Sequence, residues 1–558
     1  MRMARRNAVL AALAALTSAL ALPSAAAAAP TWLAPQTISR PGEDGDVPRV
    51  AGSPQGDAIA IWKRDEGFLH ESFEAALRPA GGSFGAPQAL TGEGSFTGAA
   101  DIAVDPHGNA VAVWRGASQR IEAAFRPAGG SFGPAQAISP QGQPSNSPQV
   151  AIDAQGKAVV VWLRFDGAKH RVEAAFRPPG GPFGPPQEIT DPAFDAGEAQ
   201  VAASPQGDVI VMWRREVGIG DHRIEAAFGS SASEKFGPPQ QLTGAGQVGL
   251  SPQVVFDRHG NAIAAWVRQA GGKQIVESAF RPAGHGFGPA QTISEQATTA
   301  QQLRLAGDPQ GNVIAAWRRN GGFLEFHVEA AFRPAGGAFG PAERLSGEGN
   351  INEPRATIDP QGNAIIVWSR FAGAANRMEA VYRPVGGPFG PAQTIAPLDQ
   401  NAVEPDVASD GRGNAIAVWR NLATPDRQIE AAGFDAAGPQ LRNLSIPATA
   451  ERGEPASFSV SPFDVWSQVA STSWSFGDGA SAQGEAVRHA FAKVGTYHVT
   501  VTSTDAVGNS STATATVRVR DTIKPRISKL RVTPSVVRPA GKGARGSAAP
   551  KGRKAKGA

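Results

Sequence analysis

The stretch EPRATIDPQGNAIIVWSRFAGAANRMEAVYRPVGGPFGPAQTI, residues 353–395, is one copy of a unit that the chain repeats eight times. One tryptophan marks each copy, and consecutive marker tryptophans are 52, 48, 51, 53, 51, 51 and 51 residues apart. A period this regular is the signature of a repeat protein. The eight markers are Trp62, Trp114, Trp162, Trp213, Trp266, Trp317, Trp368 and Trp419.

The repeat predicts four short strands. DPQGN at 359–363 predicts a tight turn, because Asp and Pro suit its first positions and Gly tolerates the left-handed φ that closes it. Strands are expected on both sides, at 355–359 and 363–369, and the second is apolar on both faces, so it must be covered above and below. A third strand is expected at 377–383, and a fourth begins near Pro391. Four strands in 51 residues correspond to one propeller blade.

A single blade cannot bury its own tryptophan, so the blades must stack on one another. A β-trefoil closes with three repeats, and an immunoglobulin-like domain needs about 100 residues, so both fit the repeat less well. The sequence therefore predicts an all-β protein whose residues 30–440 form an eight-bladed β-propeller.

The last repeat lacks an outer strand of its own. Each complete repeat has Phe four residues before Gln or Glu in that strand, but the eighth has Ala436 there. Near the N-terminus, Trp32 stands four residues before Gln36, and residues 34–39 copy the outer strand at 289–294. We therefore expect the N-terminal strand 32–39 to pair with residues 428–434 and close the ring; the alternative is an N-terminal strand without a partner.

The first 29 residues have the features of a signal peptide: three arginines, an apolar core from Ala8 to Leu22, and an alanine run ending at Ala29. The apolar core is too short for a comfortable membrane span, so the mature chain is expected to have no transmembrane segment. The Arg-rich, Ala-rich composition is typical of a GC-rich bacterial genome. The chain has no cysteine, which excludes disulfides and thiolate metal sites. We expect a secreted, extracellular or cell-surface bacterial protein.

Residues 441–520 lose the repeat and alternate in Ser, Thr and Val. Trp474, Phe476, Gly477, Asp478 and Gly479 stand in the motif WSFGDG, which is followed by RHAF at 488–491 and GTYHVTV at 495–501. This pattern resembles the PKD domain, an Ig-like β-sandwich, although the family usually has Asp where Ser475 stands. The resemblance implies a spacer or interaction module without catalysis. Asp478 is expected to accept backbone hydrogen bonds in the turn.

Residues 521–558 contain eleven Lys and Arg and one acidic residue, Asp521. This composition predicts a basic, mostly disordered tail. Its charge suits an anionic wall polymer, a lipid surface or nucleic acid without sequence specificity; the alternative is a solubilising tail that binds nothing.

Catalytic motifs are weak. The two G-x-S-x-G matches, at 81–85 and 129–133, lie between strands and lose their serine in other repeats, so we interpret them as turns. A sialidase would need a tyrosine nucleophile, but Tyr382 occupies the Phe position of its repeat. The acidic loop at 42–46 is either a calcium site or simply a solvated loop; otherwise no metal or cofactor is predicted. A glutamate recurs in every third strand and is expected to pair with Arg or His two residues earlier: Glu74, Glu122, Glu173, Glu225, Glu277, Glu329, Glu379 and Glu430.

The loops between second and third strands, and those between repeats, vary in length and content, and strand alternation places both sets on one rim. We expect ligand recognition on this variable rim, at Arg64, His70, Arg164, Lys169, Arg215, His222 and Arg319. The predicted function is a non-catalytic binding or display protein for a polysaccharide or surface protein. The alternatives are a glycan-processing hydrolase or lyase, which would gather unrepeated acidic or His side chains in the central funnel, and a wall spacer without a rim pocket.

Overall fold

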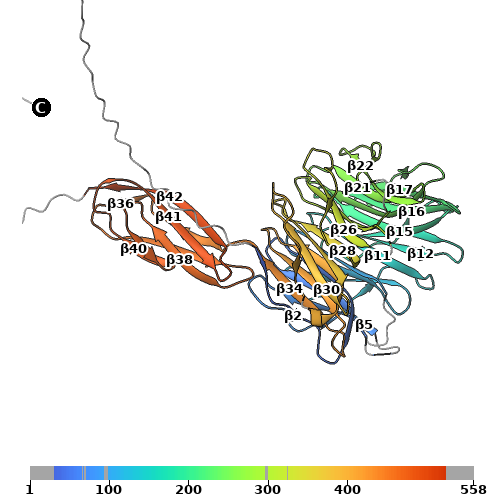
Figure 1. The fold of residues 1–558 in the computed structure, drawn as a ribbon, viewed down its shortest axis with the longest axis horizontal. Helices are drawn as coiled ribbons and strands as arrows, with labels where there is room; N and C mark the ends of the chain where they lie inside the picture. The colour runs from blue at the N-terminus through green and yellow to red at the C-terminus, as the bar shows by residue number, and fades with distance from the viewer. Residues whose placement is uncertain are drawn as a thin grey trace, which may run out of the picture.

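The computed structural model describes residues 30–65, 67, 71–92, 98–295, 299–322, 325–396 and 398–522. The predicted signal peptide and all but the first two residues of the basic tail lie outside these residues. The described chain forms a broad propeller and an elongated C-terminal module (Figure 1). It is built from β-strands and one short 3₁₀ helix, η1 (Leu398–Gln400). Among these residues, no helix has the length and apolar character needed to cross a bilayer.

The described residues form eight blades, and we number them in chain order. The inner strands are β3 (Asp44–Gly52), β7 (Ala100–Val104), β11 (Ser145–Ile152), β15 (Asp195–Ala203), β20 (Val248–Phe256), β24 (Thr299–Gly307), β28 (Asn350–Ile358) and β32 (Ala402–Ser409). The second strands are β4 (Ala58–Asp65), β8 (Ala110–Arg115), β12 (Ala158–Phe165), β16 (Asp208–Gly218), β21 (Ala262–Ala270), β25 (Val313–Asn320), β29 (Ala364–Phe371) and β33 (Ala415–Asn421).

The third strands are similar in length to the inner ones, and each outermost strand of blades 1–7 is only two residues long. The third strands are β5 (Glu71–Arg78), β9 (Ile121–Arg126), β13 (His170–Arg177), β17 (Asp221–Ser230), β22 (Lys273–Arg281), β26 (Phe326–Arg333), β30 (Asn376–Arg383) and β34 (Ile429–Asp435). The outermost strands of blades 1–7 are β6 (Gln88–Ala89), β10 (Gln136–Ala137), β14 (Gln187–Glu188), β19 (Gln240–Gln241), β23 (Gln291–Thr292), β27 (Glu343–Arg344) and β31 (Gln393–Thr394), and blade 4 adds β18 (Lys235–Phe236).

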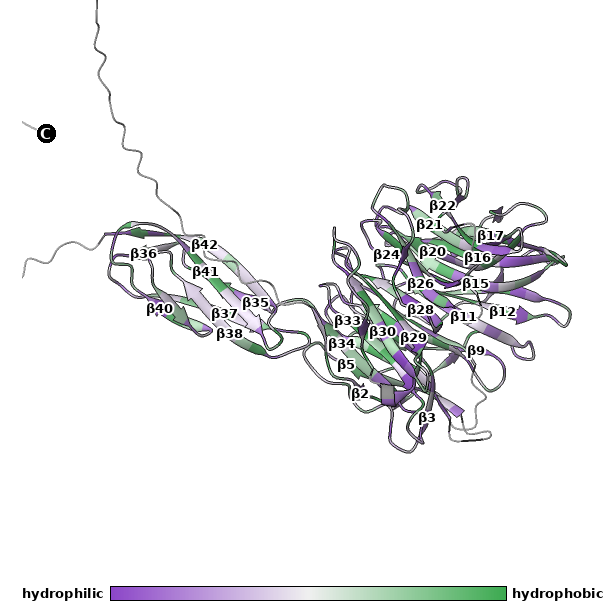
Figure 2. Cartoon of the chain, viewed as in Figure 1, coloured by the Kyte–Doolittle hydropathy of each residue, from purple (hydrophilic) through white to green (hydrophobic). Residues whose placement is uncertain are grey.

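The hydrophobic core lies between blades, as the two-sided apolar second strands predict. Each marker tryptophan is at most 1 % exposed and packs against apolar side chains of the preceding blade. Trp62 of blade 1 packs with Ile416 and Val418 of blade 8, so the last blade contacts the first and the ring closes. Hydrophobic stretches follow the strands, and hydrophilic ones gather along loops and edges (Figure 2).

Blade 8 takes its outermost strands from the N-terminus. Strands β1 (Thr31–Trp32) and β2 (Gln36–Thr37) pair antiparallel with β34, with Trp32 opposite Phe434 and Thr37 opposite Glu430. The Ser39 hydroxyl accepts a hydrogen bond from the Ile429 amide at 2.9 Å. In blade 5, Ser294 accepts the corresponding bond from Val276 at 2.8 Å. The N-terminal segment therefore reproduces the contacts of an outer strand.

The C-terminal module is a two-sheet β-sandwich. One sheet has the order β35 (Gln440–Ser445), β37 (Ala456–Phe463) and β40 (Ala486–His489). The other has the order β36 (Thr449–Glu451), β42 (Ser510–Arg520), β41 (Gly495–Asp505), β38 (Val469–Ser475) and β39 (Ser481–Gln483). Phe458, Trp474, Phe476 and Phe491 lie between the sheets and are at most 1 % exposed.

The module docks on the face opposite the variable rim, which we call the turn face because the uniform turns lie there. Gly433 stands where the third strands of the other blades carry Leu, Phe or Tyr. A Cβ atom on Gly433 would lie 2.3 Å from the ring of Trp466, so this glycine makes room for that tryptophan. Arg78 of blade 1 stacks on the same ring at 3.4 Å and donates to the Val465 carbonyl at 2.5 Å.

Candidate functional site

The recurring glutamate lies beside the marker tryptophan and is buried in every blade except blade 2, where Glu122 is half-buried. In five blades of the described chain the indole Nε1 donates to Oε2 of this glutamate at 2.9–3.1 Å. The other oxygen commonly pairs with the arginine two residues after the tryptophan, as Arg164 Nε does with Glu173 Oε1 at 2.5 Å. Pairing with the residue two positions earlier is found at Arg377 and His327. The predicted same-strand pairing is therefore the minor arrangement, because the neighbouring second strand places an Arg diagonally across from the glutamate.

The four arginines expected on the variable rim all belong to this network. They pair with their blade's glutamate, in the pairs Arg64–Glu74 at 3.5 Å, Arg164–Glu173 at 2.5 Å, Arg215–Glu225 at 2.7 Å, and Arg319–Glu329. Burial would raise the pKa of Glu329, but hydrogen bonds from His327 and Arg319 hold it below its usual value. The charge of these arginines is largely compensated, so they strengthen the rim as a scaffold.

Two further predicted residues, Lys169 and His222, line a rim pocket of about 380 Å³ between blades 3 and 4. Phe194 and the fully exposed Ile219 supply its apolar part. Lys169 bonds to the Ala193 carbonyl across the inter-blade loop. The Nδ1 atom of His222 is buried and has no hydrogen-bond partner within the described protein. The remaining predicted residue, His70, lies outside the described residues.

A second candidate site follows the propeller axis. Each inner strand places one residue opposite the residue that precedes the marker tryptophan. We call these eight residues the axial ring: Arg49, Asp101, Gln149, Gln200, Gln253, Arg304, Arg355 and Asp406. Below it, on the turn face, the ends of the inner strands of blades 1–6 line an axial cavity of about 510 Å³.

Charges in the axial ring act on one another across the propeller. Burial, reinforced by the neighbouring cations Arg355 and Arg49, lowers the pKa of Arg304 to about 9. Burial raises the pKa of Asp101 to about 6, against a hydrogen bond from the Val150 amide. Asp406 accepts the corresponding bond from Val50 at 2.9 Å, so both aspartates also join neighbouring blades.

The axial arginines retain unused donors. Arg304 Nη1 donates to the Leu303 carbonyl at 3.0 Å, but the buried Nε atoms of Arg304 and Arg355 have no acceptor in the described protein. Neighbouring buried guanidinium groups whose Nε–H donors have no acceptor favour an anionic guest.

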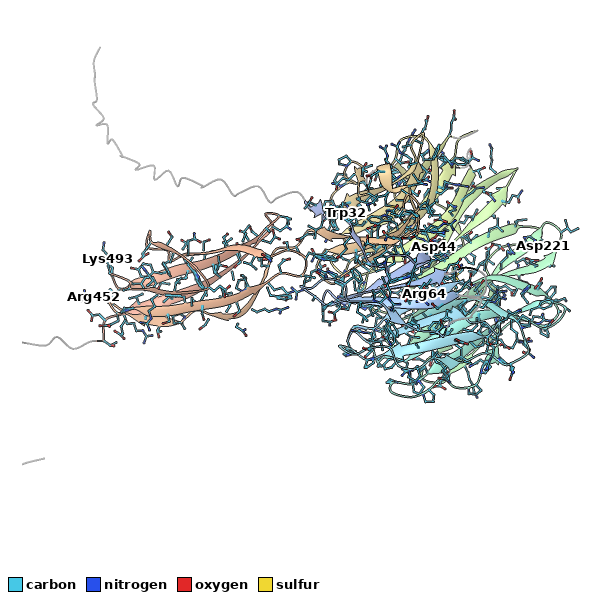
Figure 3. All side chains as sticks on the ribbon, turned by 90° about the horizontal axis from the view of Figure 1, so that it is seen from below. Trp32, Asp44, Arg64, Asp221, Arg452 and Lys493 are labelled. Atoms are coloured by element: carbon cyan, nitrogen blue, oxygen red, sulfur yellow. The ribbon has the colours of Figure 1, made fainter. Side chains whose placement is uncertain are left out.

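The acidic loop at 42–46 uses its carboxylates within the protein. Glu43 pairs with Arg64 at 3.3 Å, and Asp46 pairs with Lys63 at 3.0 Å and Arg420 at 2.9 Å. Asp44 lies 3.7 Å from Arg427. Each of these acids has a cationic partner, which leaves little negative charge for calcium here. Arg64 and Asp44 lie in the propeller, away from the C-terminal module (Figure 3).

The WSFGDG motif folds as the sequence predicts. Trp474 and Phe476 are each 1 % exposed, and both Gly477 and Gly479 have positive φ. Asp478 accepts the Ala480 amide at 3.1 Å and contacts His489 Nε2 at 2.7 Å. Burial would raise the pKa of Asp478, but the hydrogen bonds from the Ala480 amide and from His489 hold it below its usual value. Residues 436–519 match the PKD domain family. The PKD domain thus follows directly on β34 of the propeller.

Several solved structures are similar to this chain at low identity. A lectin from Burkholderia pseudomallei shares 12 % identity over 65 % of this chain and 100 % of its own, with a TM-score of 0.47. An ulvan lyase, a polysaccharide lyase, shares 10 % over 59 % and 90 %, with a TM-score of 0.41. The β-propeller domain of the Trilobed protease from Pyrococcus furiosus shares 8 % over 64 % and 98 %, with a TM-score of 0.40. Such distant likenesses carry no information on ligand or reaction.

Proposed function

We propose that this protein is a secreted or cell-surface binding protein that recognises a polysaccharide or a surface protein through its variable rim, without catalysis. The rim pocket between blades 3 and 4 carries this proposal. It combines an apolar surface from Ile219 and Phe194 with polar groups from His222, Lys169 and Glu216. Pockets that pair apolar contact with a few directed polar groups are typical of binding sites.

The position of the PKD domain supports the same function. Because the domain packs on the turn face through Trp466, the variable rim remains open. Asp221, on the rim of blade 4, lies at the end of the molecule remote from the PKD domain (Figure 3). The PKD domain would therefore not obstruct a ligand at the rim.

The PKD domain also determines where the basic tail starts. Arg452 and Lys493 mark its end remote from the propeller (Figure 3), and Arg452 pairs there with Asp521 at 2.8 Å. The tail begins at this end, and we propose that it holds the protein to an anionic wall polymer. The PKD domain would then be a rigid spacer that holds the propeller away from that surface.

One observation favours the enzymatic alternative. Asp101 and Asp406 are unlike their Arg and Gln counterparts in the axial ring, and a carboxyl with a pKa of about 6 suits acid or base catalysis. Both aspartates, however, accept a backbone amide of the next blade. We therefore assign them first to blade packing.

A polysaccharide array tests the binding function. The mature chain should bind a subset of glycans or a surface-protein preparation, and the variants Ile219→Ser and His222→Ala should weaken that binding at least about tenfold. His107→Ala is the matched control, because its exposed imidazole lies on the turn face. A variant that ends at residue 520 lacks the basic tail, so its binding distinguishes recognition by the rim from recognition by the tail.

Three outcomes decide between the alternatives. Equal binding by the two rim variants and the wild type would overturn the rim as the site. Binding that disappears only on removal of the tail would assign recognition to the tail. Depolymerisation of the bound polysaccharide, abolished by Asp101→Asn or Asp406→Asn, would establish the glycan-processing alternative instead.

A further inference from the structure

Three carboxylates from two domains meet where the PKD domain joins the propeller. Asp435 ends β34, Asp464 lies in the loop between β37 and β38, and Asp505 ends β41. One oxygen from each lies within 4.8 Å of the others. The three residues are 0, 8 and 2 % exposed, so this interface cluster is removed from bulk water.

The local hydrogen bonds leave ligand atoms unused. Asp435 Oδ1 accepts the Asn509 side-chain amide at 3.2 Å, but the buried Asp435 Oδ2 has no hydrogen-bond partner in the described protein. The buried hydroxyl of Ser467 interacts with both Asp435 and Asp464, although neither contact has full hydrogen-bond geometry. A fully buried carboxylate oxygen without a donor is costly, and a cation bound beside it would offset that cost.

The protein supplies little positive charge to this cluster. Arg78 is the nearby cation, but its guanidinium donates to the Val465 carbonyl and stacks on Trp466. Among the described residues, no salt bridge joins Arg78 to Asp435, Asp464 or Asp505. Three buried carboxylates beside a single, otherwise engaged guanidinium repel one another, and a bound cation would relieve that repulsion.

The turn around Asp505 fixes its orientation. Asp505 Oδ1 accepts the amides of Val507, Gly508 and Asn509 at 2.7–3.0 Å. Asp464 Oδ1 likewise accepts the Trp466 and Ser467 amides at 2.8 Å. These bonds hold both carboxylates in place before any ligand arrives. The cluster is therefore preorganised, and binding would need little rearrangement.

We propose that Asp435, Asp464 and Asp505, with the Ser467 hydroxyl, bind a calcium ion that joins the propeller to the PKD domain. The donors are all hard oxygen atoms, which suit Ca²⁺. Calcium–oxygen distances of about 2.3–2.6 Å place opposite ligands about 5 Å apart, in agreement with the spread of this cluster. Because Asp435 belongs to the propeller and the other ligands to the PKD domain, the ion would strengthen the interface.

Calorimetric titration of the chelator-treated mature chain with CaCl₂ tests this site, with MgCl₂ as the comparison ion. One Ca²⁺ should bind per chain, and Asp435→Asn and Asp464→Asn should each weaken it at least about tenfold. Asp359→Asn is the matched control: Asp359 accepts amides in a blade turn much as Asp505 does, away from the interface. Ser467→Ala gives a milder variant in case an aspartate variant fails to fold.

A second readout addresses the interface itself. Calcium should slow proteolytic separation of the PKD domain from the propeller in the wild type but not in Asp435→Asn. The absence of calcium binding, binding unchanged in both aspartate variants, or an equal loss in Asp359→Asn would overturn the site. Preference for Mg²⁺ over Ca²⁺ would overturn the assigned ion. None of these outcomes depends on the ligand of the variable rim.

Discussion

Arg78 of blade 1 stacks on Trp466 of the PKD domain at 3.4 Å. In other blades the equivalent arginine stacks on an aromatic ring of the preceding blade. Arg177 stacks on Phe125 of the preceding blade at 3.7 Å, and Arg383 stacks on Phe332 at 3.6 Å. Blade 8 has Gly433 at the matching position, so it cannot supply the ring. The PKD domain thus completes the packing of the propeller and is fixed to it.

Restoring the repeat residue should expel the PKD domain. In the variant Gly433→Phe, the new ring would occupy the space of Trp466 and leave that tryptophan exposed. We expect the propeller to stay folded, while small-angle scattering shows a broader distribution of distances between the two bodies. Arg126→Ala is a control, because Arg126 holds in blade 2 the repeat position that Arg78 holds in blade 1, and its guanidinium donates to Gly108 within its own blade. A scattering profile unchanged in Gly433→Phe would contradict this interface.

The N-terminal strands should contribute to the stability of the ring. Trp32 packs on Phe434 with 5.1 Å between ring centroids, so Trp32→Ala should lower the free energy of unfolding of the propeller by about 2–3 kcal/mol. Urea unfolding followed by tryptophan fluorescence measures this loss. Phe371→Ala, at a side chain that is 43 % exposed, should change it by less than about 0.5 kcal/mol. Equal stability of the two variants would mean that the N-terminal strands are dispensable.

Removing the buried glutamate should damage a blade more than removing a surface acid. Glu329→Ala leaves the Trp317 indole, His327 and Arg319 without their shared acceptor. The expected loss in the free energy of unfolding is about 2–4 kcal/mol. Glu295→Ala, which removes the exposed second partner of Arg319, should cost under about 1 kcal/mol. A similar loss in both variants would argue against the network.

Asp101 should make the free energy of unfolding of the propeller depend measurably on pH. Its pKa is about 6 in the folded protein, above the ordinary value, so the folded state binds the proton more tightly than the unfolded state. The contribution of Asp101 is therefore most favourable at low pH and falls as pH rises toward 6. Asp101→Asn should remove this fall while keeping an acceptor for the Val150 amide. Urea unfolding at several pH values between 4 and 7 measures it, and identical slopes in both proteins would contradict the assignment.

The sequence contains enough information for the ring, because periodic tryptophans and two-sided apolar strands allow few other arrangements. The N-terminal strands follow from the vacant outer strand after β34 and its copy at 34–39. The glutamate network was expected only in part. Alternation along one strand suggests that the glutamate pairs with a residue two positions away on the same strand. The arginine that it contacts lies on the neighbouring strand, and its position depends on the register between the two strands.

The axial ring and the interface were not predicted. In five inner strands the axial-ring residue directly follows a proline, and this pattern could have located the position in the sequence. The residue type at that position, however, changes between Arg, Asp and Gln from blade to blade. Gly433 and Trp466 are separate irregularities in the sequence, and only the three-dimensional contact shows that one compensates for the other. The same holds for the interface cluster, whose ligands come from three segments with no common motif.

Hydrogen–deuterium exchange in the presence of a bound glycan or surface protein tests the central claim most directly, because it maps the ligand footprint over the whole chain. If the variable rim is the recognition face, protection should concentrate in residues 190–195 and 216–222, between blades 3 and 4. Protection confined to the turn face, the PKD domain or the basic tail would contradict recognition by the rim.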